Sequence, residues 1–355
     1  MYAVIIAGGI GKRFWPRSRR ERPKQLLDII DNFSMLEATY SRLKGVTDER
    51  KIFIITGQGL KDCILKKLPD FPLKNLIIEP SGKNTAPAIG LATTLIMAKD
   101  PQAVIGIFPA DHLIRDQAAF AYAVNEGVKF ARDHNALVTF GIKPTRPATG
   151  YGYIQFDKNS RVGDSLVYKV KTFAEKPNLE TAQRFLESGV FLWNSGMFIW
   201  RGVTIMNAYK LFLPEMYECF RLIGESVDTP DYETVLKRQW ATIRSISVDY
   251  GIMEHAKNVY VVLGDFDWSD VGSWDAVYEL KSKDDNGNVL TGDILTIETE
   301  NCYIHSRKLF VATIGVKDLV VVQSKDSLLI VRRGQSEKVK EVVDWLERER
   351  KGDHT

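Results

Sequence analysis

The sequence is poor in the features that mark several protein classes. It has only three cysteines, Cys63, Cys219 and Cys302, and no C-x-x-C pair. Neither a disulfide framework nor a zinc knuckle is therefore expected. Long apolar runs are also absent, because none approaches the roughly 20 residues that a membrane-spanning helix needs. The short apolar run at the N-terminus has no basic flank and stops at Gly8, which indicates a strand and not a signal peptide.

The net charge is low as well. The 355 residues include 48 basic and 45 acidic side chains, which gives a formal net charge of +3. This balance offers no reason to expect nucleic acid or an anionic membrane as a partner. The composition is that of a soluble globular protein. We expect a cytoplasmic chain with one large and one small domain.

Alternating strand and helix patterns organise the first half of the chain. Short apolar runs predict strands over residues 3–7, 52–56, 76–79, 104–109 and 137–142. Helices are predicted over 86–98 and 118–131, and a capping box at Ser34 and Glu37 opens another. This alternation is typical of βαβ units. The predicted fold class is α/β, with a Rossmann-like, mostly parallel or mixed sheet flanked by helices.

The rest of the chain divides at a polar, turn-rich stretch. Residues 143–270 mix strands with helices and are expected to form one wall of a cleft. The stretch 282–288 is the best linker candidate, so we predict a large domain over residues 1–281 and a small β domain over 282–355. Short β-branched runs fill the second domain, and a helix with an apolar stripe closes it near residues 336–350.

A glycine-rich turn follows the first strand directly. The glycines of residues 8–11 let the backbone approach phosphates and present its N–H groups. Arg13 and Lys24 add two nearby cations, which suits a triphosphate. The turn is not a Walker A loop, which needs Gly-Lys-Ser/Thr, nor a dinucleotide fingerprint, because Phe14 fills the sixth position. The glycines alone leave open a surface turn with solvated charges.

Several segments together resemble the sugar nucleotidyltransferases, and among them the bacterial mannose-1-phosphate guanylyltransferases. The glycine turn with Arg13, followed by Pro23 and Lys24, is similar to the family signature. Six further motifs follow in the family's order, over residues 79–88, 108–112, 149–154, 173–177, 193–198 and 268–274. An ordered series is far more specific than any single motif.

The resemblance implies a reaction between GTP and mannose 1-phosphate that yields GDP-mannose and diphosphate, with Mg²⁺ as cofactor. It also implies a nucleotidyltransferase fold and a C-terminal domain that is β-helix-like, and we expect a homodimer. Many bacterial relatives carry a further phosphomannose isomerase domain. The sequence ends before such a domain, so transferase activity alone is expected.

By the same resemblance, the glycine turn holds the nucleotide through Ala7, Gly8, Gly9, Gly11, Lys12 and Arg13. Three of the cations are expected to be catalytic. Arg13 would contact the departing pyrophosphate, Lys24 the α-phosphate region, and Lys176 the phosphate of the sugar. The nucleophile is already an anion, so positioning and charge neutralisation are needed and a general base is not. A solvated charge before a proline is the alternative for Lys176.

Two carboxylates are expected to hold the metal. Asp111 follows the strand 104–109, and the carboxyl ends of strands face the crevice of open α/β sheets. A carboxylate beside phosphates calls for a cation, so Asp111 also counts as nucleotide-binding. Asp270 is the natural second ligand of octahedral Mg²⁺. The alternative for each is a helix N-cap, before residues 113–115 and 271–280.

Carboxylate and amide side chains suit the hydroxyls of a sugar. Glu175, Asn194 and the backbone of Gly152 are the candidates for reading mannose, and Asp249 is a further cleft carboxylate. His112 is interpreted as a helix-start residue with a structural hydrogen bond. The base is expected to lie against the turn before the helix 86–98, at Glu79, Ser81, Asn84 and Thr85.

Two rival functions stay open. One is a related nucleotidyltransferase that uses UTP or dTTP, or glucose 1-phosphate, and the motifs at 193–198 and 268–274 argue against it. The other is a catalytically silent regulatory homologue that binds nucleotide sugars. Such proteins tend to lose the cations or metal carboxylates, which are all present here.

Overall fold

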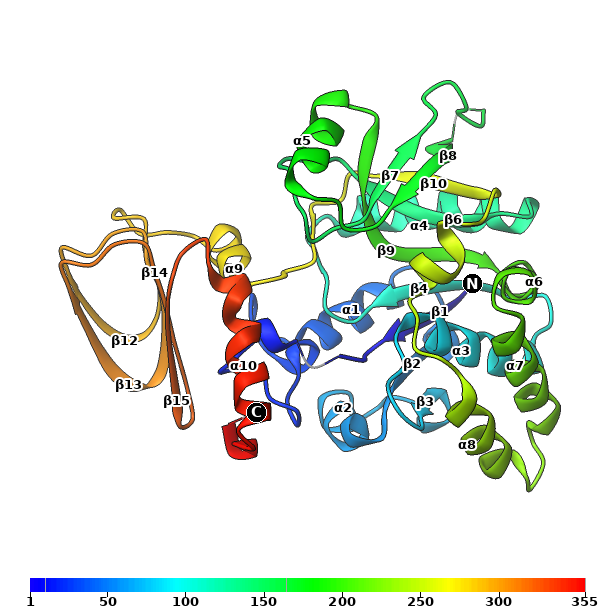
Figure 1. Cartoon of the computed structure of the whole chain (residues 1–355), viewed down its shortest axis with the longest axis horizontal. Coiled ribbons are helices and arrows are strands. Elements are labelled where there is room, and N and C mark those ends of the chain that lie inside the picture. The colour runs from blue at the N-terminus through cyan, green and yellow to red at the C-terminus, as the bar shows by residue number, and fades with distance from the viewer. Residues whose placement is uncertain (10, 164, 355) are drawn as a thin grey trace.

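The computed structural model describes residues 1–9, 11–163 and 165–354 (Figure 1). Its largest element is a sheet with the strand order β3-β2-β1-β4-β9-β6-β10-β8-β7. β1 pairs in parallel with β2 and β4, whereas β9 is antiparallel to both of its neighbours. The sheet is therefore mixed. The strands are β1 (Tyr2–Ile6), β2 (Ile52–Gly57), β3 (Leu76–Glu79), β4 (Val104–Pro109), β6 (Leu137–Ile142), β7 (Tyr153–Phe156), β8 (Val167–Ala174), β9 (Phe191–Arg201) and β10 (Val259–Gly264).

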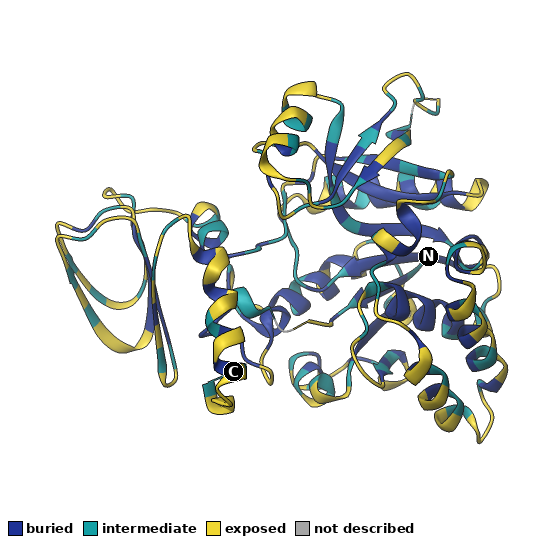
Figure 2. Cartoon of the chain, viewed as in Figure 1, coloured by how far each residue is buried: buried dark blue, intermediate teal, exposed yellow. Residues whose placement is uncertain are grey.

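Alternate side chains of the strands build a core on each face of this sheet. Most of the sheet is accordingly coloured as buried in Figure 2. Val4 and Phe53 pack on the face that α3, α6, α7 and α8 cover, and Ile5 and Ile54 on the face that α1, α2 and α4 cover. Within the described residues, no helix is both long and apolar enough to span a membrane. The helices are α1 (Met35–Lys44), α2 (Lys61–Lys67), α3 (Thr85–Lys99), α4 (Gln117–Asp133), α5 (Leu179–Ser188), α6 (Gly202–Phe212), α7 (Pro214–Ser226) and α8 (Tyr232–Thr242).

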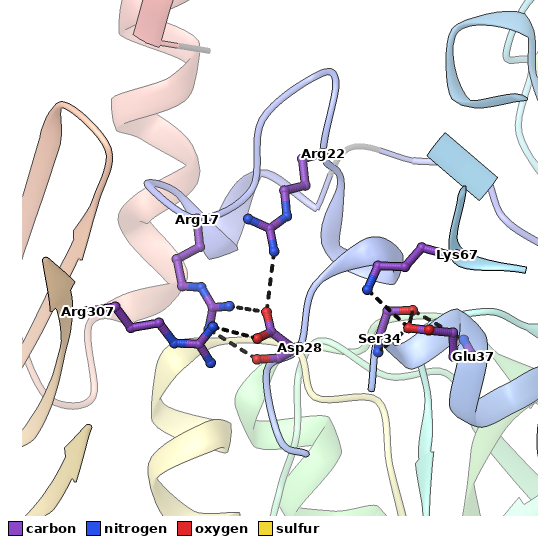
Figure 3. Close-up of polar contacts among 7 residues, drawn as sticks. All are labelled: Arg17, Arg22, Asp28, Ser34, Glu37, Lys67 and Arg307. Atoms are coloured by element: carbon purple, nitrogen blue, oxygen red, sulfur yellow. Dashed lines mark hydrogen bonds and ion pairs between the residues drawn. The ribbon is translucent and has the colours of Figure 1, made fainter. Parts of the chain in front are cut away.

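The five strands expected in the first half are all present. The capping box is present too, because Glu37 Oε2 accepts the Ser34 N–H at 2.7 Å and the Ser34 hydroxyl accepts the Glu37 N–H at 3.3 Å (Figure 3). These local patterns therefore predicted the frame of the sheet correctly.

The C-terminal segment forms a second, four-stranded sheet in the order β12-β13-β14-β15. Its first three strands pair in parallel without intervening helices, and the last returns antiparallel. The small β domain with a closing helix is thus confirmed, whereas the boundary after residue 281 stays a prediction. The elements are α9 (Trp274–Leu280), β12 (Val289–Ile297), β13 (Tyr303–Ile314), β14 (Leu319–Ser324), β15 (Ser327–Arg332) and α10 (Val339–Arg348).

A third core joins the glycine turn to the C-terminal domain. Phe14 from the turn packs edge-on against Trp274 of α9, with ring centroids 5.0 Å apart. Trp274 in turn stacks on Tyr303 of β13 at 5.6 Å. Val343 of α10 is buried in the same cluster. The two parts of the chain therefore meet next to the predicted phosphate loop.

Three arginines converge on Asp28 at this junction (Figure 3). Arg307 Nη1 lies 2.7 Å from Asp28 Oδ2 and Arg22 Nη2 lies 3.4 Å from Oδ1, which also pairs with Arg17. Burial alone would raise the pKa of Asp28, but the charges of Arg17 and Arg307 lower it below its ordinary value. Asp28 therefore ties β13 to the segment that follows the glycine turn.

Asp28→Asn keeps the shape of this side chain and removes its charge. We expect the free energy of unfolding at pH 7 to fall by about 3 kcal/mol, because Arg17 stays buried without a counter-charge. The pKa of Asp28 is lower in the folded than in the unfolded chain, where it is about 4. The stabilisation by the Asp28 charge is therefore fully present in the wild type above pH 4 and is lost as the pH falls through the folded-state pKa. Urea unfolding should therefore show that the difference in free energy of unfolding between the wild type and Asp28→Asn becomes smaller from pH 7 to pH 3.

Arg22→Ala is the control, because it removes a partner that is mostly exposed. This substitution should lower the free energy of unfolding by less than about 1 kcal/mol. If Asp28→Asn lowers the free energy of unfolding no more than Arg22→Ala does, Asp28 does not bridge the two parts of the chain.

Candidate active site

The glycine turn after β1 is shaped around Lys24. Gly9 and Gly11 have φ angles of +90° and +67°, a region that favours glycine. A Cβ at Gly11 would lie 2.4 Å from the Cβ of Lys24, so glycine allows the turn to pack against the lysine. Gln25 Nε2 donates to the carbonyl oxygens of Ala7 and Gly9, at 3.1 and 3.2 Å. The side chain of Gln25, the residue next to Lys24, thus fixes the backbone of the turn.

Lys24 also links the two aspartates that are predicted to hold the metal. Its buried Nζ donates to Asp111 Oδ2 at 2.7 Å and to the backbone carbonyl oxygen of Asp270 at 2.6 Å. Asp270 Oδ1 accepts a hydrogen bond from the Tyr151 hydroxyl at 2.6 Å. Asp111 lies just beyond the carboxyl end of β4, as predicted. The alternative that these aspartates cap helices is wrong, because residues 113–114 after Asp111 form a strand and Ser273, not Asp270, caps α9.

The electrostatics at this point favour an ionised Asp111 and a neutral His112. Burial alone would raise the pKa of Asp111, but the ammonium of Lys24 lowers it below its ordinary value. Burial lowers the pKa of His112 to about 4. Trp268 Nε1 donates to His112 Nδ1 at 3.2 Å, which is the structural hydrogen bond expected for the histidine. His112 precedes the short strand β5 (Leu113–Ile114), however, and not a helix.

Two neighbouring cavities share Asp111, His112 and Asp270 in their walls. The first, here called the loop cavity, has a volume of about 360 Å³ and is lined by Gly11, Lys12, Arg13 and Lys24 as well. The second, the inner cavity, has a volume of about 310 Å³ and reaches past Gly8 and Thr85 to Gly152, Glu175, Asn194 and Asp249. The two aspartates therefore stand between a compartment lined with cations and one lined with carboxylates and amides.

The predicted sugar-binding residues form a polar network in the inner cavity. Asn194 Nδ2 donates to Asp249 Oδ1 at 2.8 Å, and the Asn194 backbone N–H donates to the Gly152 carbonyl at 2.8 Å. A Cβ at Gly152 would lie 2.3 Å from Glu175 Oε2, so glycine leaves room for that carboxylate. Burial and the charge of Glu175 raise the pKa of Asp249 to about 6. Lys176 pairs with Glu175 at the edge of the network.

Only some of the residues predicted to bind the base line the two cavities. Thr85 lines the inner cavity, but within the described residues Glu79, Ser81 and Asn84 line neither of the two cavities. Glu79 faces a separate cavity of about 810 Å³ beside α3 and α8. The Ser81 carbonyl accepts from Trp240 Nε1 at 2.8 Å, and Asn84 is the N-cap of α3. Their part in base recognition stays a prediction.

Carboxylates from the C-terminal domain meet the glycine turn, and these contacts were not predicted. Arg13 Nε lies 3.0 Å from Glu337 Oε2. Lys12 Nζ lies 2.8 Å from Asp344 Oδ1 and 2.7 Å from Glu347 Oε2. More than 330 residues separate the partners of Lys12 along the chain, so no local pattern could reveal them. Two predicted nucleotide-binding cations are thus paired with acidic side chains in this structure.

The donor set between the two cavities fits a divalent metal. Within the described part of the chain, no group of three or more His, Cys, Asp or Glu side chains is arranged to hold an ion. Asp111 and Asp270 offer carboxylate oxygens, and the other ligands of a hard cation would be phosphate oxygens and water. The site therefore fits a metal that binds together with a nucleotide.

Comparison with known sequences now decides the family. Residues 2–287 match the model of the family described as nucleotidyl transferase. The chain belongs to this family. Residues 292–346 match the MannoseP isomerase/GMP-like beta-helix domain. Both the nucleotidyltransferase fold and the β-helix-like C-terminal domain are therefore confirmed, and the protein is a nucleotidyltransferase, a class of enzyme that generally uses a divalent metal.

Relatives with similar sequences cover nearly the whole chain. It is similar to the mannose-1-phosphate guanylyltransferase of Escherichia coli, with 39% identity over 99% of this chain and 76% of the relative. The enzyme RfbM of Salmonella typhimurium is 38% identical over 97% of this chain and 72% of its own length. A crystal structure described as mannose-1-phosphate geranyltransferase from Thermus thermophilus is 33% identical, with a TM-score of 0.88 over 98% of this chain and 99% of that one.

The contact between Gly11 and Lys24 can be tested with alanine. Gly11→Ala should lower the free energy of unfolding by about 1–3 kcal/mol, because the new Cβ meets the lysine and the φ angle is left-handed. Gly8→Ala is the matched control, since nothing lies within 4 Å of its added Cβ, and it should change stability by less than about 0.5 kcal/mol. Denaturant unfolding measures both. Equal effects of the two substitutions would refute the idea that the turn packs on Lys24.

Proposed function

We propose that this nucleotidyltransferase is a mannose-1-phosphate guanylyltransferase, which joins GTP and mannose 1-phosphate to form GDP-mannose and diphosphate. The observation that carries the proposal is the pair of cavities that share Asp111 and Asp270. One compartment offers the glycine turn and cations for a polyphosphate, and the other offers acceptors and donors for sugar hydroxyls. The names of the most similar relatives support the choice of base and sugar.

The reaction needs charge neutralisation more than proton transfer. The phosphate of the sugar is already an anion, and its attack on the α-phosphorus brings two polyanions together. Lys24 and Arg13 are proposed to neutralise the triphosphate, and Lys176 the sugar phosphate. His112 is not required as a base, and its low pKa and its hydrogen bond to Trp268 suit a structural role.

We propose that Asp111 and Asp270 hold Mg²⁺ on the phosphates. When bound there, the ion would neutralise the charge that develops on the phosphate oxygens. Lys24 contributes from the other side by fixing the Asp111 carboxylate and the backbone of Asp270 in one geometry. Positioning of this kind accounts for much of the catalysis expected at such a site.

Mannose is proposed to bind among Glu175, Asn194, Asp249 and the backbone of Gly152. The two carboxylates accept hydrogen bonds from hydroxyl groups, and the amide of Asn194 both donates and accepts. These groups come from separate segments that meet in the inner cavity, which gives the pocket a defined shape. A cytoplasmic location, in keeping with a biosynthetic enzyme, and the expected homodimer complete the proposal.

A substrate panel tests the proposed function. Pyrophosphate release is measured with GTP, UTP or dTTP, each with mannose 1-phosphate and glucose 1-phosphate. The highest kcat/KM is expected for GTP with mannose 1-phosphate. Faster turnover with UTP and glucose 1-phosphate would overturn the assignment of substrates. Tight binding of GDP-mannose without any pyrophosphate release would instead favour a regulatory homologue.

The metal carboxylates can be tested separately. Asp111→Ala and Asp270→Ala should each lower kcat by at least about a hundredfold, because each removes a carboxylate that would hold Mg²⁺ on the phosphates. Asp265→Ala is the control, since Asp265 is an exposed aspartate nearby. Pyrophosphate release with saturating GTP and Mg²⁺ gives the measurement. Near wild-type turnover of either test variant means that the metal assignment is wrong.

A further inference from the structure

The C-terminal helix α10 is fixed directly beside the loop cavity. Lys12 pairs with two carboxylates of this helix, Asp344 and Glu347, and Arg20 Nη2 lies 3.1 Å from Glu347 Oε1. Arg13 pairs with Glu337, two residues before the helix begins. These contacts hold the segment before α10 and the C-terminal half of the helix against the glycine turn.

Apolar packing sets the rotation of the same helix. Val339, Val343 and Leu346 are buried in the cluster that also contains Phe14 and Trp274. Because Val339 is anchored there, the next residue, Lys340, has a defined place at the edge of the loop cavity and lines its wall. The C-terminal domain thus supplies a cation to the compartment that the glycine turn builds.

The charges around the loop cavity single out this lysine. The other cations in its wall are already paired: Lys12 with Asp344 and Glu347, Arg13 with Glu337, and Lys24 with Asp111. The side chain of Lys340 is exposed and makes no hydrogen bond or ion pair within the described residues, although its charge adds to that of Lys12 in lowering the pKa of Asp344. Among the described residues, Lys340 is therefore the cation in this wall that is left without a direct ion pair.

We propose that Lys340 binds the phosphates that leave as pyrophosphate. This inference rests on the proposed function, which places the sugar in the inner cavity. In an in-line displacement the leaving group lies opposite the nucleophile, and the loop cavity lies on the other side of Asp111 and Asp270. A lysine ammonium without a protein partner is suited to the oxygens of that leaving group. The C-terminal domain then completes the active site as well as packing against it.

The test uses Lys340→Ala, Lys340→Arg and the control Lys338→Ala. Lys338 is an exposed lysine that precedes the same helix, and it does not line the loop cavity. Binding of inorganic pyrophosphate to the full chain is measured by titration calorimetry. We expect Lys340→Ala to raise the Kd about tenfold, as for a lost hydrogen bond to a charged group. Lys340→Arg should recover most of this loss, and Lys338→Ala should stay within about twofold of the wild type.

Kinetics provide a second readout. Lys340→Ala should weaken product inhibition by pyrophosphate and raise the KM for GTP, while the KM for mannose 1-phosphate stays unchanged. A purely structural effect would alter both substrates together and lower the thermal midpoint. The inference is overturned if Lys340→Ala matches Lys338→Ala in pyrophosphate affinity, or if the wild type does not bind pyrophosphate. Lys340-dependent pyrophosphate binding in a wild type that fails to make GDP-mannose would sustain the inference and refute the proposed function.

Discussion

Burial of the Lys24 ammonium group is the constraint on which the site depends. Only 7% of the side chain is exposed, and an isolated buried ion costs several kcal/mol. Asp111 Oδ2 and the Asp270 carbonyl offset this cost with hydrogen bonds of 2.7 and 2.6 Å. The turn after β1, the end of β4 and the segment before α9 must therefore meet at one point. The geometry of both cavities follows, because all three segments contribute to the walls.

Much of the fold could be predicted from contiguous residues. The strands of the first half have apolar runs, and the capping box of α1 is recognisable in the sequence from Ser34 and Glu37. Such patterns are local, so they can be interpreted without knowing which strands or helices pack against them. The antiparallel placement of β9 between β4 and β6 is different, because it depends on the strands with which β9 pairs. The same holds for the helices α6 and α7, which pack on one face of the sheet.

The site was predictable where a motif coincides with a strand end, and less so elsewhere. Asp111 follows β4 and reaches the crevice, as expected. Glu79 also ends a strand, but side chains alternate along a strand, and it shares the face of Ile77 toward α3 and α8. Tyr151 lies inside a recognised motif and Gln25 directly follows one. Their hydrogen bonds nevertheless join segments that sequence alone does not place together.

The pairing of Lys12 with Glu347 has a consequence for synthesis of the chain. The two residues are 335 positions apart, and at rates of about 5–20 residues per second roughly 20–70 s separate their appearance at the ribosome. During that interval the glycine turn carries cations whose acidic partners do not yet exist. A growing chain therefore carries a basic loop whose charge is not yet balanced by the carboxylates of α10. Completion of the last helix balances this charge, so the nascent and the finished protein differ in charge at the same surface.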